Sequence, residues 1–292
     1  MTSEPKTPAA WGIFLSRLWG PRFPVDVRQI AFEYSKRFDD PVLKIEPADV
    51  GGGFEGALYP LKKKGGWAIL YNPNIRSAGR INFTLSHEWG HYLVHRKLVP
   101  DGFECQQQGM LGYDRTEIVR KREQEADEFA SYLLMPIDDF RKQVTGSKIS
   151  LDLLGHCATR YGTSLTASAL KWIAFTPEAA TLVYAVDDHV LWARPSDSAR
   201  KAGIFFPKGM ALPAASSAQS KQTASGEGVL HPPGVWLPRA AVREVTIVAD
   251  NYDATISLLQ FPELGGPTVF GDESEEDAVD FMKRRGLDRD RR

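Results

Sequence analysis

The sequence contains few cysteines and no long apolar run. Only two cysteines, Cys105 and Cys157, occur in 292 residues, without C-x-x-C spacing. So few argue against a disulfide-stabilised secreted fold. No segment approaches the roughly 18 apolar residues of a membrane span, and the N-terminus lacks a basic start followed by an apolar stretch. We therefore expect a soluble cytoplasmic protein with no membrane association.

An excess of charge of one sign is also missing. The chain carries 36 Lys and Arg residues against 37 Asp and Glu residues, which gives a formal net charge of -1. Nucleic-acid-binding proteins need a concentrated positive surface, so this balance argues against direct nucleic-acid binding. With 42% hydrophobic residues, the chain can bury a sizeable core. Its length is compatible with about two domains.

Regular apolar spacing divides the first half of the chain into helices and strands. Helical spacing occurs at 24–38, 80–99 and 114–135, and strand patterns occur at 42–47, 56–61 and 66–72. Pro136 should end the third helix. We predict an α+β domain at 24–145, in which a small sheet packs on the two long helices, preceded by a flexible segment at 1–23.

The second half of the chain shows a different pattern. Residues 146–177 predict a helical hairpin with helix-turn-helix-like spacing. Paired strand patterns then predict a β-rich module of unknown role at 178–270, including a mobile loop at 214–228 that is poor in large apolar residues. An acidic run followed by a basic run predicts a solvated charged tail at 271–292.

The chemistry of the chain is indicated by HEWGH at 87–91. Residues four apart on a helix differ by about 40° around its axis, so His87 and His91 can offer two imidazole nitrogens to one metal ion. Glu88 lies on the same side, where it can take a proton from a metal-activated water and pass it to a leaving amine. Gly90 either admits a neighbouring element or is a tolerated helix glycine. The simplest alternative is two core histidines on an ordinary helix.

A catalytic zinc normally takes three protein ligands, so a third must come from elsewhere. On the helix at 114–135, Glu123 lies on the side of the small and apolar residues, whereas Glu125 and Glu128 should face solvent. Asp127, one turn later, can accept the outer N–H of a metal-bound imidazole and fix its tautomer. His95 is the rival third ligand, or else a hydrogen-bonded support.

The two motifs together resemble the ImmA/IrrE family of metallopeptidases. The matching pieces are NFTLSHEWGHYLVH at 82–95 and EQEADEFASYLLMP at 123–136, which is similar to the second-helix signature of the family. GWAILYNP at 66–73 resembles the strand that precedes the first motif in that family. The resemblance covers about residues 24–140.

The resemblance implies a cytoplasmic, zincin-like metallo-endopeptidase with one zinc ion per chain, manganese or another divalent ion being the alternative. It implies His87, His91 and Glu123 as metal ligands and Glu88 as general base. Members typically cleave a helix-turn-helix transcriptional repressor and thereby switch on stress-response or mobile-element genes. Asp127 departs from the Asn that is common at that position.

The sequence alone leaves other interpretations of the function open. The chain could be a non-catalytic, metal-containing regulatory module that binds DNA or protein, or a peptidase silent until the β-rich module receives a partner. If it is a peptidase, a substrate strand could add to the 66–72 edge, although that strand could equally just close the sheet. Tyr113 and His95 are candidates for stabilising the oxyanion.

Overall fold

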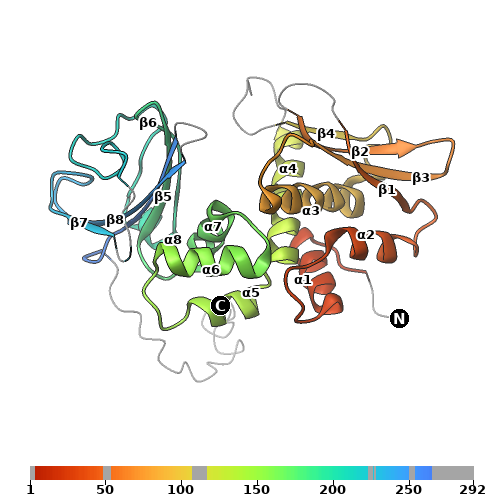
Figure 1. Ribbon diagram of the computed structural model, residues 1–292, viewed down its shortest axis with the longest axis horizontal. Coiled ribbons are helices and arrows are strands. Elements are labelled where there is room, and N and C mark those ends of the chain that lie inside the picture. The colour runs from red at the N-terminus through yellow and green to blue at the C-terminus, as the bar shows by residue number, and fades with distance from the viewer. Residues whose placement is uncertain are drawn as a thin grey trace, which may run out of the picture.

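The computed structural model describes residues 4–48, 54–106, 117–222, 226, 228–249 and 254–264. Figure 1 shows an N-terminal sheet and a C-terminal sheet at opposite ends, with helices between them. The helices of the described residues are α1 Pro8–Trp19, α2 Val27–Ser35, α3 Ala78–His95, α4 Glu117–Leu134, α5 Ile137–Val144, α6 Leu151–Tyr161, α7 Leu165–Phe175 and α8 Asp197–Lys201. The strands are β1 Val42–Pro47, β2 Phe54–Leu61, β3 Gly66–Tyr71, β4 Phe103–Gln106, β5 Ala180–Val186, β6 His189–Pro195, β7 Val229–His231, β8 Val242–Ala249 and β9 Ala254–Gln260.

The N-terminal sheet has the strand order β1-β3-β2-β4. β1 and β3 are parallel, while β2 pairs antiparallel with both β3 and β4. The predicted hairpin of β2 and β3 is therefore present. Of the two interpretations of residues 66–72, the structure supports the strand that only closes the sheet, because β3 lies inside the sheet and both of its sides are already hydrogen-bonded.

The N-terminal segment is not flexible over its whole length, which corrects the prediction for 1–23. Residues 8–19 form α1, whose first turn is capped by the hydroxyl of Thr7. Trp11 and Leu15, one turn apart, are buried and hold the helix in the core. At Gly12 an added Cβ would lie 2.7 Å from Cβ of Tyr132, so the glycine lets α1 approach α4 closely.

The two long helices α3 and α4 pack against each other. An apolar stripe on α3, made of Leu85, Trp89 and Leu93, is buried. A Cβ at Gly90 would lie 2.9 Å from Cδ1 of Phe129 and 3.3 Å from Cα of Ala126, both on α4. Gly90 thus admits the neighbouring helix, as one of the two readings of the sequence predicted. This close packing fixes the distance between residues facing each other across α3 and α4.

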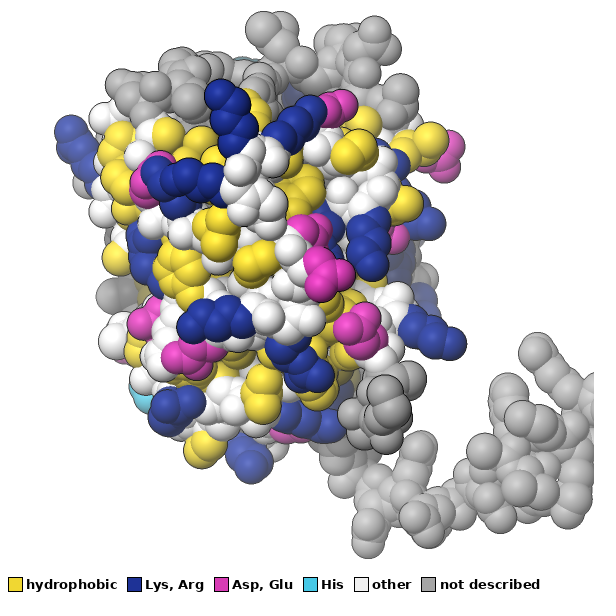
Figure 2. Space-filling model, turned by 90° about the vertical axis from the view of Figure 1, so that its right-hand side faces the viewer, with side chains coloured by type: hydrophobic (Ala, Val, Ile, Leu, Met, Phe, Trp, Pro, Cys, Tyr) yellow, Lys and Arg dark blue, Asp and Glu magenta, His cyan; other side chains and the backbone are white. Residues whose placement is uncertain are grey.

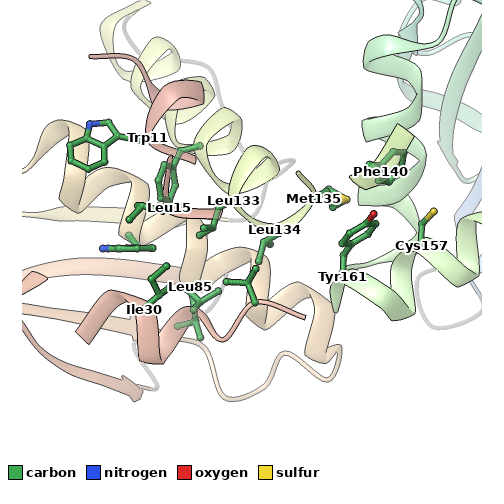
Figure 3. Packing of buried hydrophobic residues seen from close by; sticks show 14 of the residues in the cluster. Trp11, Leu15, Ile30, Leu85, Leu133, Leu134, Met135, Phe140, Cys157 and Tyr161 are labelled. Atoms are coloured by element: carbon green, nitrogen blue, oxygen red, sulfur yellow. The ribbon is translucent and has the colours of Figure 1, made fainter. Parts of the chain in front are cut away.

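One hydrophobic core joins these helices to α5, α6 and α7. Figure 3 shows it extending from Trp11 and Leu15 past Leu134 and Met135 to Tyr161. Pro136 follows the end of α4, as predicted, and it is also the N-cap residue of α5, a helix that was not predicted. Because the core is continuous, the helical hairpin is held against the preceding helices.

The predicted helical hairpin is present as α6 and α7. Ser150 and Ser164 cap the two helices, and Gly162 ends α6 in the left-handed conformation with a φ of 58°. The hairpin turn contacts α3, because the Asn82 side-chain amide donates to the Gly162 carbonyl at 3.2 Å. Lys171 of α7 lies within 3.2 Å of the Ser131 hydroxyl on α4. The second helix of the hairpin is therefore occupied by intramolecular packing.

The C-terminal sheet is antiparallel and has the order β6-β5-β9-β8-β7. It contains the two predicted hairpins, β5 with β6 and β8 with β9. One face contributes Leu182 and Leu258 to the core shared with α7, and the other contributes Val183 and Leu259 to a second cluster. Such two-sided burial explains why its strands are so apolar.

Residues 214–228 were predicted to form a mobile loop, but the first part of this segment is held in place by hydrogen bonds. The backbone amides of Ser217 and Ala218 donate to the carboxylate of Glu244 at 3.0 and 2.9 Å, and Trp236 Nε1 donates at 2.9 Å. Glu244 is fully buried on β8, so these bonds anchor the loop to the sheet. Composition alone could not reveal an acceptor that lies 26 residues downstream of Ala218.

Two further predictions concern residues that lie outside the described part of the chain. The charged tail at 271–292 lies outside them, as does Tyr113. Among the helices that the structure does describe, none is long and apolar enough to cross a membrane.

Candidate metal centre

The structure brings His87 and His91 of α3 together with Glu123 of α4. Nε2 of His91 lies 3.0 Å from Nε2 of His87 and 3.5 Å from Oε1 of Glu123. The other Glu123 oxygen, Oε2, lies 3.8 Å from Nε2 of His87. One potential ligand atom from each residue lies within 4.8 Å of the other two. The three groups converge as the helical spacing predicted.

The donor set fits a catalytic transition metal. Two imidazole nitrogens and one carboxylate are a common ligand set of catalytic zinc, which keeps a further position for water or substrate. Calcium and magnesium prefer sites made of oxygen ligands. Within the described residues, His87, His91 and Glu123 are the single group of this type that could hold a metal ion. The arrangement therefore suits zinc or a similar divalent ion.

Asp127 lies where it can orient His87. Its Oδ1 is 2.9 Å from Nδ1 of His87, on the opposite side of the ring from the Nε2 that faces Glu123. A carboxylate accepting from Nδ1–H leaves the Nε2 lone pair for a metal. The position of Asp127 one turn after Glu123 therefore agrees with the predicted supporting contact.

The two ligand histidines have opposite pKa shifts. Burial lowers the pKa of His87, but the hydrogen bond and charge of Asp127, with two other carboxylates nearby, outweigh burial and raise the pKa to about 9. For His91, burial dominates and the charge of His87 adds to it, so the pKa falls to about 4 despite Glu123. Near neutral pH, the metal-free protein therefore holds a charged His87 beside a neutral His91.

Metal affinity should consequently depend on pH. A metal ion at Nε2 needs neutral His87, so below the pKa of about 9 binding must displace one proton. We expect the apparent zinc affinity to rise about tenfold per pH unit between pH 6.5 and 8.5, measured by competition with a chromophoric chelator. In Asp127→Asn, where burial of His87 prevails, the slope should be much shallower. A flat profile in the wild type would contradict this assignment.

Glu88 is buried under the N-terminal sheet. Its side chain is 0% exposed, and it follows directly after the ligand His87 on α3. A Cβ at Gly56 of β2 would lie 2.7 Å from Oε1 of Glu88 and 2.5 Å from Cγ2 of Thr84. β2 therefore passes directly over this carboxylate, and only a glycine fits at the crossing. Gly56 was not among the predicted site residues; its one signal in the sequence is a glycine at the start of a predicted strand.

Gly56→Ala should therefore disturb both stability and the site. The added methyl group must displace β2, Thr84 or Glu88, which we expect to cost about 1–3 kcal/mol of unfolding free energy. Urea denaturation of the metal-free proteins measures this loss. Gly155→Ala is the matched control, because a Cβ there meets nothing within 4 Å. An unchanged midpoint in Gly56→Ala would show that the strand moves away without cost.

His95 lies outside the group of converging ligand atoms. Its Nδ1 is 3.0 Å from Nδ1 of His91, on the side of that ring away from Glu123. Its other nitrogen, Nε2, lies 2.8 Å from Oε2 of Glu125. The prediction that Glu125 faces solvent is therefore wrong, although Glu128 is exposed as predicted. Angular position on α4 did not account for a buried histidine reaching towards it from α3.

A comparison with family models gives a match over residues 50–172. The matching model is Peptidase_M78, described as the IrrE N-terminal-like domain. Residues 50–172 are thus similar to this domain. The match spans both ligand-bearing helices and confirms the resemblance to the ImmA/IrrE metallopeptidases. It also continues through α6 into α7, whereas α1, α2 and the C-terminal sheet lie outside it.

The Peptidase_M78 match agrees with an α+β arrangement of helices on a small sheet. Among solved structures, a Mycobacterium tuberculosis transcriptional regulator is similar, with a TM-score of 0.52 and 11% sequence identity. The similarity covers 86% of this chain and 76% of that one. At so low an identity, it concerns the fold alone. A search of curated proteins gives no match.

Proposed function

We propose that this protein is a zinc-dependent endopeptidase that hydrolyses a peptide bond in a protein substrate. The observation that carries the proposal is the fully buried Glu88 directly after a ligand of the His–His–Glu cluster. A structural zinc site needs no such base, whereas hydrolysis does. The Peptidase_M78 domain supports the same reaction class.

His87, His91 and Glu123 would hold the metal ion, through the two Nε2 atoms and the carboxylate. A divalent ion would supply Lewis acidity, which polarises a carbonyl and makes a water molecule more acidic. Glu88 accepts a proton from the attacking water at its carboxylate and delivers it to the nitrogen of the leaving amine. Burial beneath β2 excludes bulk water from this carboxylate. The proton taken from the attacking water is therefore passed to the leaving amine and not lost to solvent.

A substrate strand would pair with β4 in this proposal. Among the described residues β4 pairs with β2 alone, so its other side is the edge nearest the site. Cys105 of β4 is the partner of Gly56, the residue that covers Glu88. Main-chain hydrogen bonds along β4 would give affinity that tolerates different sequences.

The proposed substrate is a helix-turn-helix transcriptional repressor in the cytoplasm, whose cleavage would derepress stress-response or mobile-element genes. Support comes from the family resemblance. On the face seen in Figure 2, Lys and Arg side chains are interspersed with acidic and hydrophobic ones, which does not favour nucleic acid as the partner there.

The alternative, a non-catalytic DNA-binding module, has less support. A helix that reads DNA must be free to enter the major groove. α7, the second helix of the hairpin, instead has Ala169, Trp172 and Ile173 buried and packs between α4 and the C-terminal sheet.

The experiment that tests the proposal measures metal content and proteolysis together. The purified full chain is analysed for bound metal and incubated with purified helix-turn-helix repressors, with and without a chelator. We expect discrete fragments only from the metal-loaded protein, and recovery of cleavage on adding zinc after chelation. A chain that binds no divalent metal would contradict the proposal, and a chain that binds metal but cleaves none of the repressors would favour the non-catalytic, metal-containing alternative.

A further inference from the structure

The strongest unassigned feature is the chain of contacts behind His91. His95, one helical turn further along α3, is buried, with 1% of its surface exposed. Both of its ring nitrogens are within hydrogen-bond distance of another side chain: Nδ1 faces Nδ1 of His91 at 3.0 Å, and Nε2 faces Oε2 of Glu125 at 2.8 Å. A buried imidazole thus connects a predicted metal ligand to a carboxylate on the other helix.

The role of His91 as a ligand fixes the direction of these hydrogen bonds. If Nε2 of His91 holds a metal, its proton must be on Nδ1, which then donates to Nδ1 of His95. An accepting Nδ1 leaves the proton of His95 on Nε2, which donates to Glu125. All three groups are satisfied in one arrangement, with the lone pair of His91 Nε2 directed at Glu123 and His87.

We propose that His95 and Glu125 are positioning residues that hold His91 in the tautomer and orientation needed to bind the metal. This inference rests on the proposed metal site and adds residues that its ligand set does not contain.

The two ligand histidines are supported in different ways. His87 has a carboxylate directly on its Nδ1, whereas His91 reaches one only through His95. His91 is fully buried, while the side chain of Glu125 is 29% exposed. The relay therefore lets a deeply buried ligand be oriented by a charge that remains partly in water, where ionisation is less costly.

The test compares His95→Phe with His95→Gln in the full chain. Phenylalanine fills the space without accepting a hydrogen bond, whereas the glutamine side-chain oxygen can still accept from Nδ1–H of His91. Zinc affinity is measured by chelator competition, and the visible spectrum of the cobalt-loaded protein reports ligand geometry. We expect His95→Phe to bind zinc about 10–100-fold more weakly with an altered cobalt spectrum, and His95→Gln to recover most of the affinity.

Glu125→Ala gives a second test from a partly exposed position, where folding is less at risk. We expect a smaller loss of zinc affinity than in His95→Phe, because His95 is still present but is no longer oriented. Glu128→Ala on the same helix and His156→Phe on α6 are the matched controls and should bind zinc as the wild type does. Circular dichroism and melting of the metal-free proteins verify folding.

Different failures have different meanings. If the wild type binds no zinc, the proposed metal site itself is wrong. If the wild type binds zinc and both His95→Phe and Glu125→Ala bind it equally well, the site stands and the positioning role is overturned. Equal losses in His95→Gln and His95→Phe would also overturn it, because they would indicate general packing and not hydrogen bonding to His91.

Discussion

Glu88→Gln is expected to lower the rate of substrate cleavage by about a hundredfold to ten-thousandfold, the usual contribution of a general acid–base group. Glutamine has nearly the same shape but cannot accept the proton of the attacking water. Because Glu88 is not one of the three converging ligands, the variant should contain as much metal as the wild type. Quantitative cleavage assays and metal analysis of the same preparations measure both effects.

Glu128→Gln is the matched control for this substitution. It also replaces a glutamate by glutamine, but at an exposed position on α4, so cleavage and metal content should both be unchanged. Cleavage by Glu88→Gln at the wild-type rate would exclude Glu88 as the base.

Glu123→Ala should have the largest effect on metal binding. It removes one of three protein ligands, so we expect a loss of zinc affinity well above the 10–100-fold typical of residues that only support a ligand. Zinc should also stop stabilising the protein. For the wild type, free zinc at a thousand times the dissociation constant is expected to add about 4 kcal/mol of unfolding free energy.

The measurement compares thermal melting with and without zinc, together with chelator competition. Glu128→Ala, which removes an exposed carboxylate from the same helix, should retain the full zinc-dependent rise in melting temperature. If Glu123→Ala kept that rise, another residue would have to supply the third ligand. His95 would be the first to test, since it lies next to His91.

Much of the secondary structure could be predicted because local patterns specify it. β1 begins and ends at the predicted residues, and α3, α4, α6 and α7 occur where apolar spacing indicated helices. α1 was missed although it has local signals: Thr7 as N-cap, a proline in the first turn and the pair Trp11 and Leu15. Residues 1–23 were predicted to be flexible, but the apolar side chains of α1 pack on α4.

The convergence of the metal-binding groups was also predictable, since helical geometry determines which residues share a face. His87 and His91 are four apart on α3, and Glu123 with Asp127 are four apart on α4. The motif pair is then sufficient to predict that the two faces meet. By contrast, nothing local to β2 indicates that Gly56 crosses Glu88, because that contact depends on how the sheet lies across α3.

The sequence by itself determined α2, α3, α4, α6 and α7, most of the strands and the resemblance to the ImmA/IrrE family. It also determined the predicted ligands His87, His91 and Glu123 and the predicted base Glu88, because each follows from patterns within one or two elements. Only the tertiary structure decided that β3 is internal, that Glu125 turns towards His95, and that Glu244 anchors the 217–218 turn. These features depend on hydrogen bonds and close contacts between segments distant in sequence. Burial makes such partners obligatory, but no local pattern identifies them.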